Sequence, residues 1–232
     1  MPSRKDESQY ELTYQMLSDV KRTEPKYLWS ERIPVGKLTL LIGNPRGCLA
    51  QKIACEICAE VSVKEKKSVP QHACLYFSCE NSYGDTLRPF VEEYGGDLNH
   101  IYAAQEIIGG RKPREFVLKE HLILRQWVEK LEAKHGTGYV NLVVFDPMMA
   151  YTVNCEPKGR QVRSELMPIL RLAAEKEFAV LGLGYFSKSD TDKTTGNWGG
   201  SSMFTEMADT IWHVLPAKTR KGYSLRNVKK RT

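Results

Sequence analysis

Residues 37–50 read KLTLLIGNPRGCLA and contain the most informative pattern in the chain. The short apolar run from Leu38 to Ile42 is typical of a buried strand, and the Gly43-Asn44-Pro45 stretch after it favours a turn. A helical pattern follows and continues to about Ser62. A strand, a turn and a helix in this order are the usual setting of a loop that binds phosphate, because backbone N–H groups and the helix dipole both attract an anion there.

The loop departs from the phosphate-binding consensus, GxxxxGK followed by Ser or Thr, at its defining positions. Counting from Gly43, these positions hold Cys48, Leu49 and Ala50. Leucine cannot donate to a phosphate, alanine cannot ligate Mg²⁺, and cysteine adds a side chain where glycine lets the backbone approach closely. The sequence therefore predicts the framework of a nucleotide site without its chemistry.

Two cations near the loop could still attract a bound phosphate. They are Arg46 and Lys52, but Lys52 lies three residues beyond the usual lysine, which is nearly a full helical turn. We therefore expect weak binding of ATP and Mg²⁺ and little hydrolysis. The candidate nucleotide-binding residues are Gly43, Asn44, Pro45, Arg46, Gly47 and Lys52.

Strand and helix patterns alternate along most of the chain. The further strands that we expect cover 73–78, 100–103, 140–145, 178–185, 210–215 and 223–228, and the further helices cover 85–94, 115–135 and 160–176. This alternation predicts an α/β fold with a mostly parallel sheet, helices on both faces and a C-terminal strand hairpin. We expect an N-terminal extension over residues 1–26 and one domain over residues 27–232.

Two acidic residues directly follow expected strands. Asp146 ends the apolar run 142–145, and Glu80 follows the strand at 73–78. Ligands of parallel sheets bind at the carboxyl ends of the strands. An aspartate there could position Mg²⁺ and its water, and a glutamate could act as a general base. An acid after a strand is also a common turn or cap residue, so it is the pair on one edge that favours a catalytic site, with Asp146 as the metal ligand.

Several segments follow one another in an order that belongs to a known family. They are 27–29, 33–39, 75–81, 85–90, 142–147, 150–151, the helix from Val162 to Ala174, 200–202 and 224–231. In these segments the chain resembles the RecA-fold ATPases of the RepA-like kind, the hexameric replicative helicases of plasmids and phages, which are relatives of DnaB. The resemblance covers about Leu28 to Arg231.

The resemblance implies roles for individual residues. Glu80 matches the catalytic glutamate and Asp146 matches the Walker B aspartate. Lys188 lies where the family carries a basic residue near the subunit boundary, from which it could reach a neighbour's nucleotide. The loop at 187–200 corresponds to one that faces the central channel and single-stranded DNA in a ring. Tyr185-Phe186 stand where the family often has a histidine pair or similar sensor of the γ-phosphate.

The net charge of +6 comes from the C-terminal end of the chain. Residues 218–232 contain seven basic residues and no acid, which leaves a charge of −1 on residues 1–217. Such a segment favours a polyanionic partner, single-stranded DNA first, with Tyr223 as a stacking surface. The candidate contacts are Lys193, Trp198, Lys218, Arg220, Lys221, Arg226, Lys229, Lys230 and Arg231. The alternative is a hairpin whose basic residues keep a sheet edge soluble.

Composition argues against several other classes of protein. No apolar run approaches the ~20 residues of a membrane helix, and the N-terminus is polar. We therefore expect a cytoplasmic protein without a membrane partner, in which the six cysteines are reduced thiols. Cys55 and Cys58 have CxxC spacing but lie inside a helical pattern, and no second ligand pair completes a zinc site.

The interpretation that we favour is a RepA/RecA-like, DNA-associated protein of replication or recombination with weak or lost ATP hydrolysis. We expect it to form a homo-oligomeric ring or to be a subunit of a larger complex. Two alternatives stay open: an active ATP-dependent DNA helicase with a divergent loop, and a non-enzymatic adaptor or assembly subunit.

Overall fold

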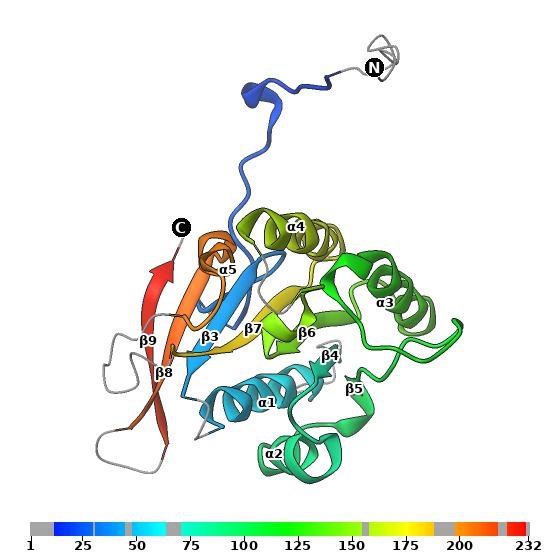
Figure 1. The fold of residues 1–232 in the computed structure, drawn as a ribbon. Coiled ribbons are helices and arrows are strands. Elements are labelled where there is room, and N and C mark those ends of the chain that lie inside the picture. The colour runs from blue at the N-terminus through cyan, green and yellow to red at the C-terminus, as the bar shows by residue number, and fades with distance from the viewer. Residues whose placement is uncertain are drawn as a thin grey trace, which may run out of the picture.

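The computed structural model of the chain describes residues 12–29, 31–44, 48–63, 71–154, 158–187, 198–217 and 222–230. At its centre lies a seven-stranded sheet with the order β5-β4-β6-β7-β3-β8-β9 (Figure 1). The strands are β3 (Leu38–Gly43), β4 (Ala73–Ser78), β5 (Ile101–Ala103), β6 (Val140–Asp146), β7 (Ala179–Tyr185), β8 (Thr210–Pro216) and β9 (Tyr223–Lys230). All neighbouring strands are parallel except β8 and β9, which form an antiparallel hairpin. The predicted fold class is confirmed.

Helices cover both faces of the sheet, as Figure 1 shows. The helices are α1 (Leu49–Ser62) and α2 (Arg88–Glu93) on one face, and α3 (His121–His135), α4 (Gly159–Lys176) and α5 (Ser202–Met207) on the other. Successive residues of a strand point to opposite faces, so β3 contributes to two separate cores. Leu40 packs in the cluster that contains residues of α3, α4 and α5, while Leu41 packs in the cluster that contains residues of α1 and α2.

The structure also contains short elements that the sequence patterns did not predict. Strands β1 (Tyr27–Trp29) and β2 (Ile33–Pro34) form a small antiparallel pair before β3, and α5 precedes β8. The 3₁₀-helices are η2 (Leu17–Asp19), η5 (Leu98–His100), η6 (Leu118–Glu120) and η7 (Met148–Tyr151), and η4 (Tyr83–Leu87) is a π-helical turn.

The long helix expected at 115–135 starts later than predicted. Phe116 is buried beside Phe77, with ring centroids 4.8 Å apart, and the backbone before it is bridged through Arg114 to Ile107. A turn of η6 then leads into α3 at His121. The packing of Phe116 in the core therefore overrides the helical periodicity of its neighbours.

Residues 12–26 extend away from the domain body and contribute no buried side chain (Figure 1). Leu12, Tyr14 and Leu17 are 87%, 89% and 85% exposed. Residues 12–26 are the described part of the extension expected over residues 1–26. Residues 1–11 lie outside the described ranges, and the domain boundary stays a prediction. Within the described ranges, no helix combines the length and apolar character that crossing a membrane requires.

Strand β7 depends on glycine at its centre. A Cβ atom at Gly182 would lie 2.6 Å from the Met148 sulfur and 2.9 Å from a methyl carbon of Leu40. Met148 belongs to η7, directly after β6, so the missing side chain at Gly182 lets the segment that follows Asp146 lie flat against the sheet.

Gly182→Ala should lower the free energy of unfolding by about 1–3 kcal/mol, because an extra methyl group overpacks this contact. Urea denaturation followed by circular dichroism would measure the change. Gly84→Ala is the matched control, since a Cβ atom there meets nothing within 4 Å. Equal midpoints for the two variants would contradict the packing argument.

Candidate active site at the carboxyl edge of the sheet

The loop between β3 and α1 keeps part of the backbone geometry of a phosphate-binding loop. Cys48, which replaces the consensus glycine, caps α1 with φ 47°, in the left-handed region. A non-glycine residue adopts this conformation at a cost of about 1–2 kcal/mol. Gly43 and Asn44 lie on the other side of the loop, and the predicted phosphate-binding residues Pro45, Arg46 and Gly47 fall outside the described residues.

The two positions after Cys48 are used for packing. Leu49 packs against the apolar cluster between α1 and the sheet, and Ala50 is 2% exposed. In the consensus these positions supply the lysine for the phosphates and the hydroxyl for Mg²⁺. Here both face apolar neighbours, so the first turn of α1 holds the helix on the sheet and offers no side-chain donor to an anion.

Asp146 is fully buried at the carboxyl end of β6, and both of its oxygens accept hydrogen bonds. Gln51 donates to Oδ1 at 3.2 Å, while Asn81 and Tyr76 donate to Oδ2 at 3.0 and 3.3 Å. All three donors are neutral and come from α1, the turn after β4 and β4 itself. The carboxylate is therefore satisfied inside the protein without a cation.

This burial makes the charged form of Asp146 costly. Removal from water raises the pKa of Asp146 to about 6 from an ordinary value of 3.8, and the nearby charge of Glu80 acts in the same direction. The hydrogen bonds from Gln51, Asn81 and Tyr76 lower the pKa and only partly offset the burial. Asp146 is thus a carboxyl group held by neutral donors and ready to take up a proton in mildly acidic solution.

Glu80 lies on the same edge, because β4 and β6 are neighbours and Ser78 pairs with Asp146. The Tyr185 hydroxyl donates to Glu80 Oε2 at 2.6 Å and accepts from Gln51 Nε2 at 3.2 Å. Burial, followed by the hydrogen bond to Glu80, raises the pKa of Tyr185, so the hydroxyl keeps the proton that it donates. One line of hydrogen bonds therefore connects Asp146, Gln51, Tyr185 and Glu80.

These residues do not fit Mg²⁺. The ion requires near-octahedral oxygen ligands at about 2.0–2.1 Å. Both oxygens of Asp146 already face neutral donors, and Ala50 has no hydroxyl. Among the described residues, no group of three or more His, Cys, Asp or Glu side chains could hold a metal ion. The amides of Gln51 and Asn81 and the phenol of Tyr76 surround the Asp146 carboxylate, where the resemblance to the RepA-like helicases implies a bound cation.

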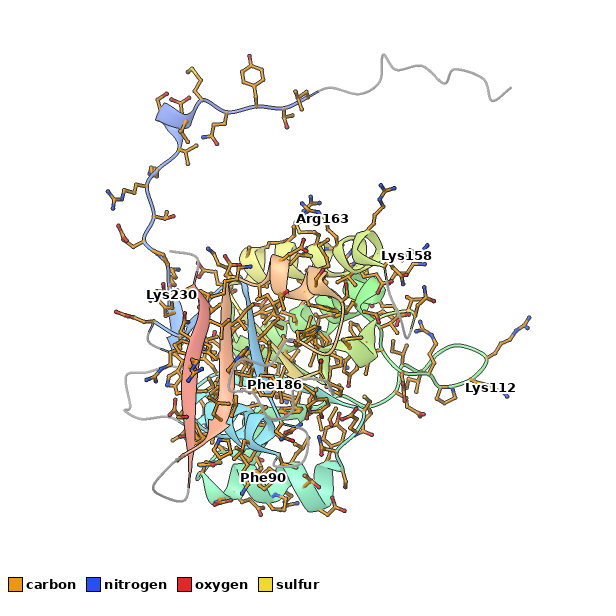
Figure 2. The ribbon with its side chains drawn as sticks, turned by 60° about the vertical axis from the view of Figure 1, so that its left-hand side comes forward. Phe90, Lys112, Lys158, Arg163, Phe186 and Lys230 are labelled. Atoms are coloured by element: carbon orange, nitrogen blue, oxygen red, sulfur yellow. The ribbon has the colours of Figure 1, made fainter. Side chains whose placement is uncertain are left out.

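A cleft of about 900 Å³ opens beside Glu80, between the segments that follow β6 and β7. Its polar lining includes Glu80, Tyr185 and Asn154, and its apolar lining includes Met149 and Phe186. Figure 2 shows Phe186 among the side chains at the middle of the molecule. The sequence patterns placed Glu80 at this edge and gave no sign of the cleft, which forms only when two loops meet.

Two of the other predicted site residues, Lys52 and Trp198, contact neighbours within the chain. The Lys52 ammonium lies 5.0 Å from the Phe90 ring centroid on α2, so it interacts with that helix. Trp198 is partly buried against Phe204 and stands where a Cβ atom of Gly184 would overlap its ring. Trp198 was predicted as a nucleic-acid contact, and this packing leaves its ring only partly exposed. Lys188 and Lys193 lie outside the described residues.

The C-terminal basic residues that the structure describes belong to the edge strand β9. Lys229 donates to the carbonyl oxygens of Thr205 and Glu206 at 2.6 and 2.9 Å, near the end of α5. Lys230 lies 3.5 Å from Glu31, and its ammonium is 5.8 Å from the Tyr27 ring centroid. An ammonium group is favourable at carbonyls that end a helix. Arg226 also lies on β9, and Lys218, Arg220, Lys221 and Arg231 lie outside the described residues.

Tyr223 also differs from the free stacking surface that we expected. Its hydroxyl donates to Glu56 Oε2 at 2.6 Å, which ties the start of β9 to α1. The described part of the basic segment therefore agrees best with the alternative of a solvated sheet edge. Contact with nucleic acid through the remaining residues stays a prediction.

The sequence reasoning missed three functional neighbours of Asp146. Gln51 directly follows the degenerate loop, Asn81 directly follows Glu80, and Tyr76 lies two residues before the end of β4. Each is a neutral donor at a position adjacent to a predicted site residue. A search for donors that could replace a cation would have found Gln51 and Asn81.

A comparison with protein-family models adds independent information about this edge. The model described as AAA domain matches residues 5–191, which is most of the chain. The chain belongs to the AAA domain family. The strand order and the loop before α1 agree with the P-loop ATPase core of an AAA domain, and members of such a family bind nucleotide with Mg²⁺ in general. A search of curated proteins found no match.

Stability of this AAA domain should fall as the pH rises from about 4 to 7. Between the ordinary pKa of 3.8 and the folded-state pKa of about 6, the folded protein binds a proton at Asp146 that the unfolded chain releases. The loss approaches about 3 kcal/mol at pH 7. Asp146→Asn should remove it, so the unfolding free energy of the variant relative to the parent should rise with pH.

Urea denaturation at several pH values would measure this difference. Asp85→Asn is the control, because the exposed Asp85 has a pKa lowered by a hydrogen bond from Thr86 and its removal should give the opposite, smaller trend. Parallel pH profiles for Asp146→Asn and the parent would contradict the effect of burial.

Proposed function

We propose that this chain is a RepA/RecA-like, DNA-associated protein of replication or recombination that hydrolyses ATP weakly or not at all. The observation that carries the proposal is the buried carboxylate of Asp146, which is satisfied by Gln51, Asn81 and Tyr76. A residue that must hold a cation needs an oxygen open toward the phosphates. In this chain both Asp146 oxygens already accept hydrogen bonds, and Oδ1 accepts from the side-chain amide of Gln51.

The state of Glu80 supports the same proposal. A general base must accept a proton from a water molecule. Glu80 Oε2 instead accepts a short hydrogen bond from Tyr185, whose hydroxyl is linked to Gln51. Activation of water would require this bond to break or to be shared, and the loss of the phosphate-binding lysine adds about 2–3 kcal/mol against nucleotide binding.

The match to the AAA domain family supports an ATPase-type protein. The resemblance to the RepA-like helicases supports the role in DNA replication or recombination. Within the proposal, the protein is cytoplasmic, forms a homo-oligomer or joins a larger complex, and contacts single-stranded DNA. Such a chain keeps the ATPase fold and contributes to an assembly in which other proteins hydrolyse ATP.

The exposed apolar side chains of residues 12–20 favour a second candidate, an adaptor that works through protein contacts alone. Leu12, Tyr14 and Leu17 are more than four-fifths exposed, and isolated exposed apolar residues are common, but a series of them on one extended arm favours a protein partner. In this case neither ATP nor DNA would bind to the purified chain.

The unmodified protein should release almost no phosphate from ATP, and restoring the consensus should increase ATP affinity. Leu49→Lys with Ala50→Ser returns the missing donor and hydroxyl, and a gain of about 2–3 kcal/mol corresponds to an increase of about 30- to 150-fold in affinity. Adding Gln51→Ala opens the Oδ1 side of Asp146, so turnover should appear in the triple variant only. Fluorescent-nucleotide titration and phosphate release would measure the two effects.

The control is the triple variant with Glu80→Gln, which should bind ATP and release no phosphate. Robust phosphate release by the unmodified protein would show that the closed edge is no obstacle and would favour the active helicase alternative. A restored variant that binds ATP no better than the parent would show that positions 49 and 50 do not limit the site.

A further inference from the structure

Helix α4 presents three arginines on one exposed face. Arg160, Arg163 and Arg171 are all exposed, and at about 100° per residue their positions fall within roughly 80° of one another around the helix axis. At 1.5 Å per residue they span about 16 Å along the helix. Figure 2 shows Arg163 directed outward from α4, with Lys158 at the start of the same helix.

These arginines have no acidic partners. In the described part of the chain, no hydrogen bond or ion pair involves the guanidinium group of Arg160, Arg163 or Arg171. The acidic residues of α4 are engaged elsewhere: Glu165 accepts from the backbone N–H of Val153, and Glu175 binds Arg125 at 2.6 Å. No acid of α4 therefore pairs with this arginine face.

A groove runs beside the arginine face, between α4 and α5. Its volume is about 430 Å³, and its lining combines methionine and leucine side chains of both helices with three charged side chains, one of them from β9. The lining residues are Arg163, Met167, Leu170, Met203, Glu206, Met207 and Lys229. Methionine adapts its shape to a neighbour and makes favourable contacts with aromatic rings. A flat aromatic group therefore fits this groove while a negative group contacts Arg163 at its rim.

We infer that this α4–α5 surface binds single-stranded DNA, with phosphates on the arginine face and bases against the methionines. The inference rests on the DNA association in the proposed function and gives it a location other than the C-terminal segment. The phosphates of one DNA strand repeat every few ångströms, so a face of about 16 Å contacts several of them. The planar guanidinium fork binds phosphate through two parallel hydrogen bonds and also stacks on bases.

The methionines of the groove favour nucleic acid over an acidic protein segment as the occupant. An acidic segment offers carboxylates to the arginines but brings few aromatic rings for the methionine floor. Single-stranded DNA supplies a phosphate and an exposed ring in every nucleotide, and both halves of the surface are then used.

The test is the binding of a labelled oligothymidylate to the full chain over a range of salt concentrations. Arg160→Gln, Arg163→Gln and Arg171→Gln together should weaken binding at least tenfold. They should also reduce the slope of log affinity against log salt by about 2, at about 0.7 for each lost phosphate contact. Glutamine keeps a good helix propensity, so α4 should persist, and a urea denaturation curve would check this.

The matched control changes the same amount of charge at a distant place. Arg111→Gln and Lys112→Gln alter exposed residues of the loop that carries Lys112, which Figure 2 shows far from Arg163, and Lys21→Gln removes a third charge from the exposed N-terminal extension. This variant should keep the salt slope of the parent. A second variant, Arg160→Lys with Arg163→Lys and Arg171→Lys, should keep the salt slope of the parent but only part of its affinity.

Each outcome decides the inference. An unchanged affinity and slope in the glutamine variant would overturn it while leaving DNA association intact. Equal losses in the glutamine variant and the distant control would also overturn it, because only overall charge would matter. Competition by polyglutamate as strong as by oligothymidylate of equal charge would assign the surface to an acidic protein. No binding by the parent would remove both this inference and the DNA association, while the nucleotide experiments would still test the catalytic edge separately.

Discussion

The buried carboxylate of Asp146 is the constraint on which the candidate site depends. It ends strand β6 inside the sheet, is completely shielded from water, and receives hydrogen bonds from three side chains. An ionised group in such a place is tolerated only when its lone pairs are satisfied. The donors on α1, on β4 and after β4 therefore fix the relative positions of these elements. Because the donors belong to the chain itself, their contacts with Asp146 are part of the fold.

The hydrogen bonds from Gln51 through Tyr185 to Glu80 extend this arrangement across three strands. Strand β3 leads into α1, which carries Gln51. Its neighbour β7 ends at Tyr185, and β4, on the far side of β6, ends two residues before Glu80. In an enzyme, groups at such an edge are poised to change partners during a reaction. Here they bond to one another, which stabilises one resting arrangement of the edge.

The sequence was sufficient for the fold because its strands are continuous apolar runs that end in clear turn signals. The strand from Ala73 to Ser78 was predicted at its observed bounds, and the acids after β4 and β6 were correctly assigned to one edge. The bonds of Gln51 could not be predicted, since they depend on how α1 rotates over the sheet. The same holds for Trp198 and Tyr223, which pack against Gly184 and Glu56 from distant parts of the chain. Charge runs and aromatic residues alone do not reveal such long-range partners.

Trp198 packs beside the end of β7 and holds the described chain around it close to that strand. Phe186 and Trp198 form a β-bridge, and the N–H of Gly199 donates to the carbonyl of Tyr185 at 2.9 Å. The described chain on either side of residues 188–197 is thus held together at the end of β7. Once two such ends are held, doubling the number of residues between them costs only about 0.6 kcal/mol in closure entropy. Insertions between these two ends should therefore have little effect on the sheet, so the sequence can diverge there while Tyr185 and Glu80 stay in place.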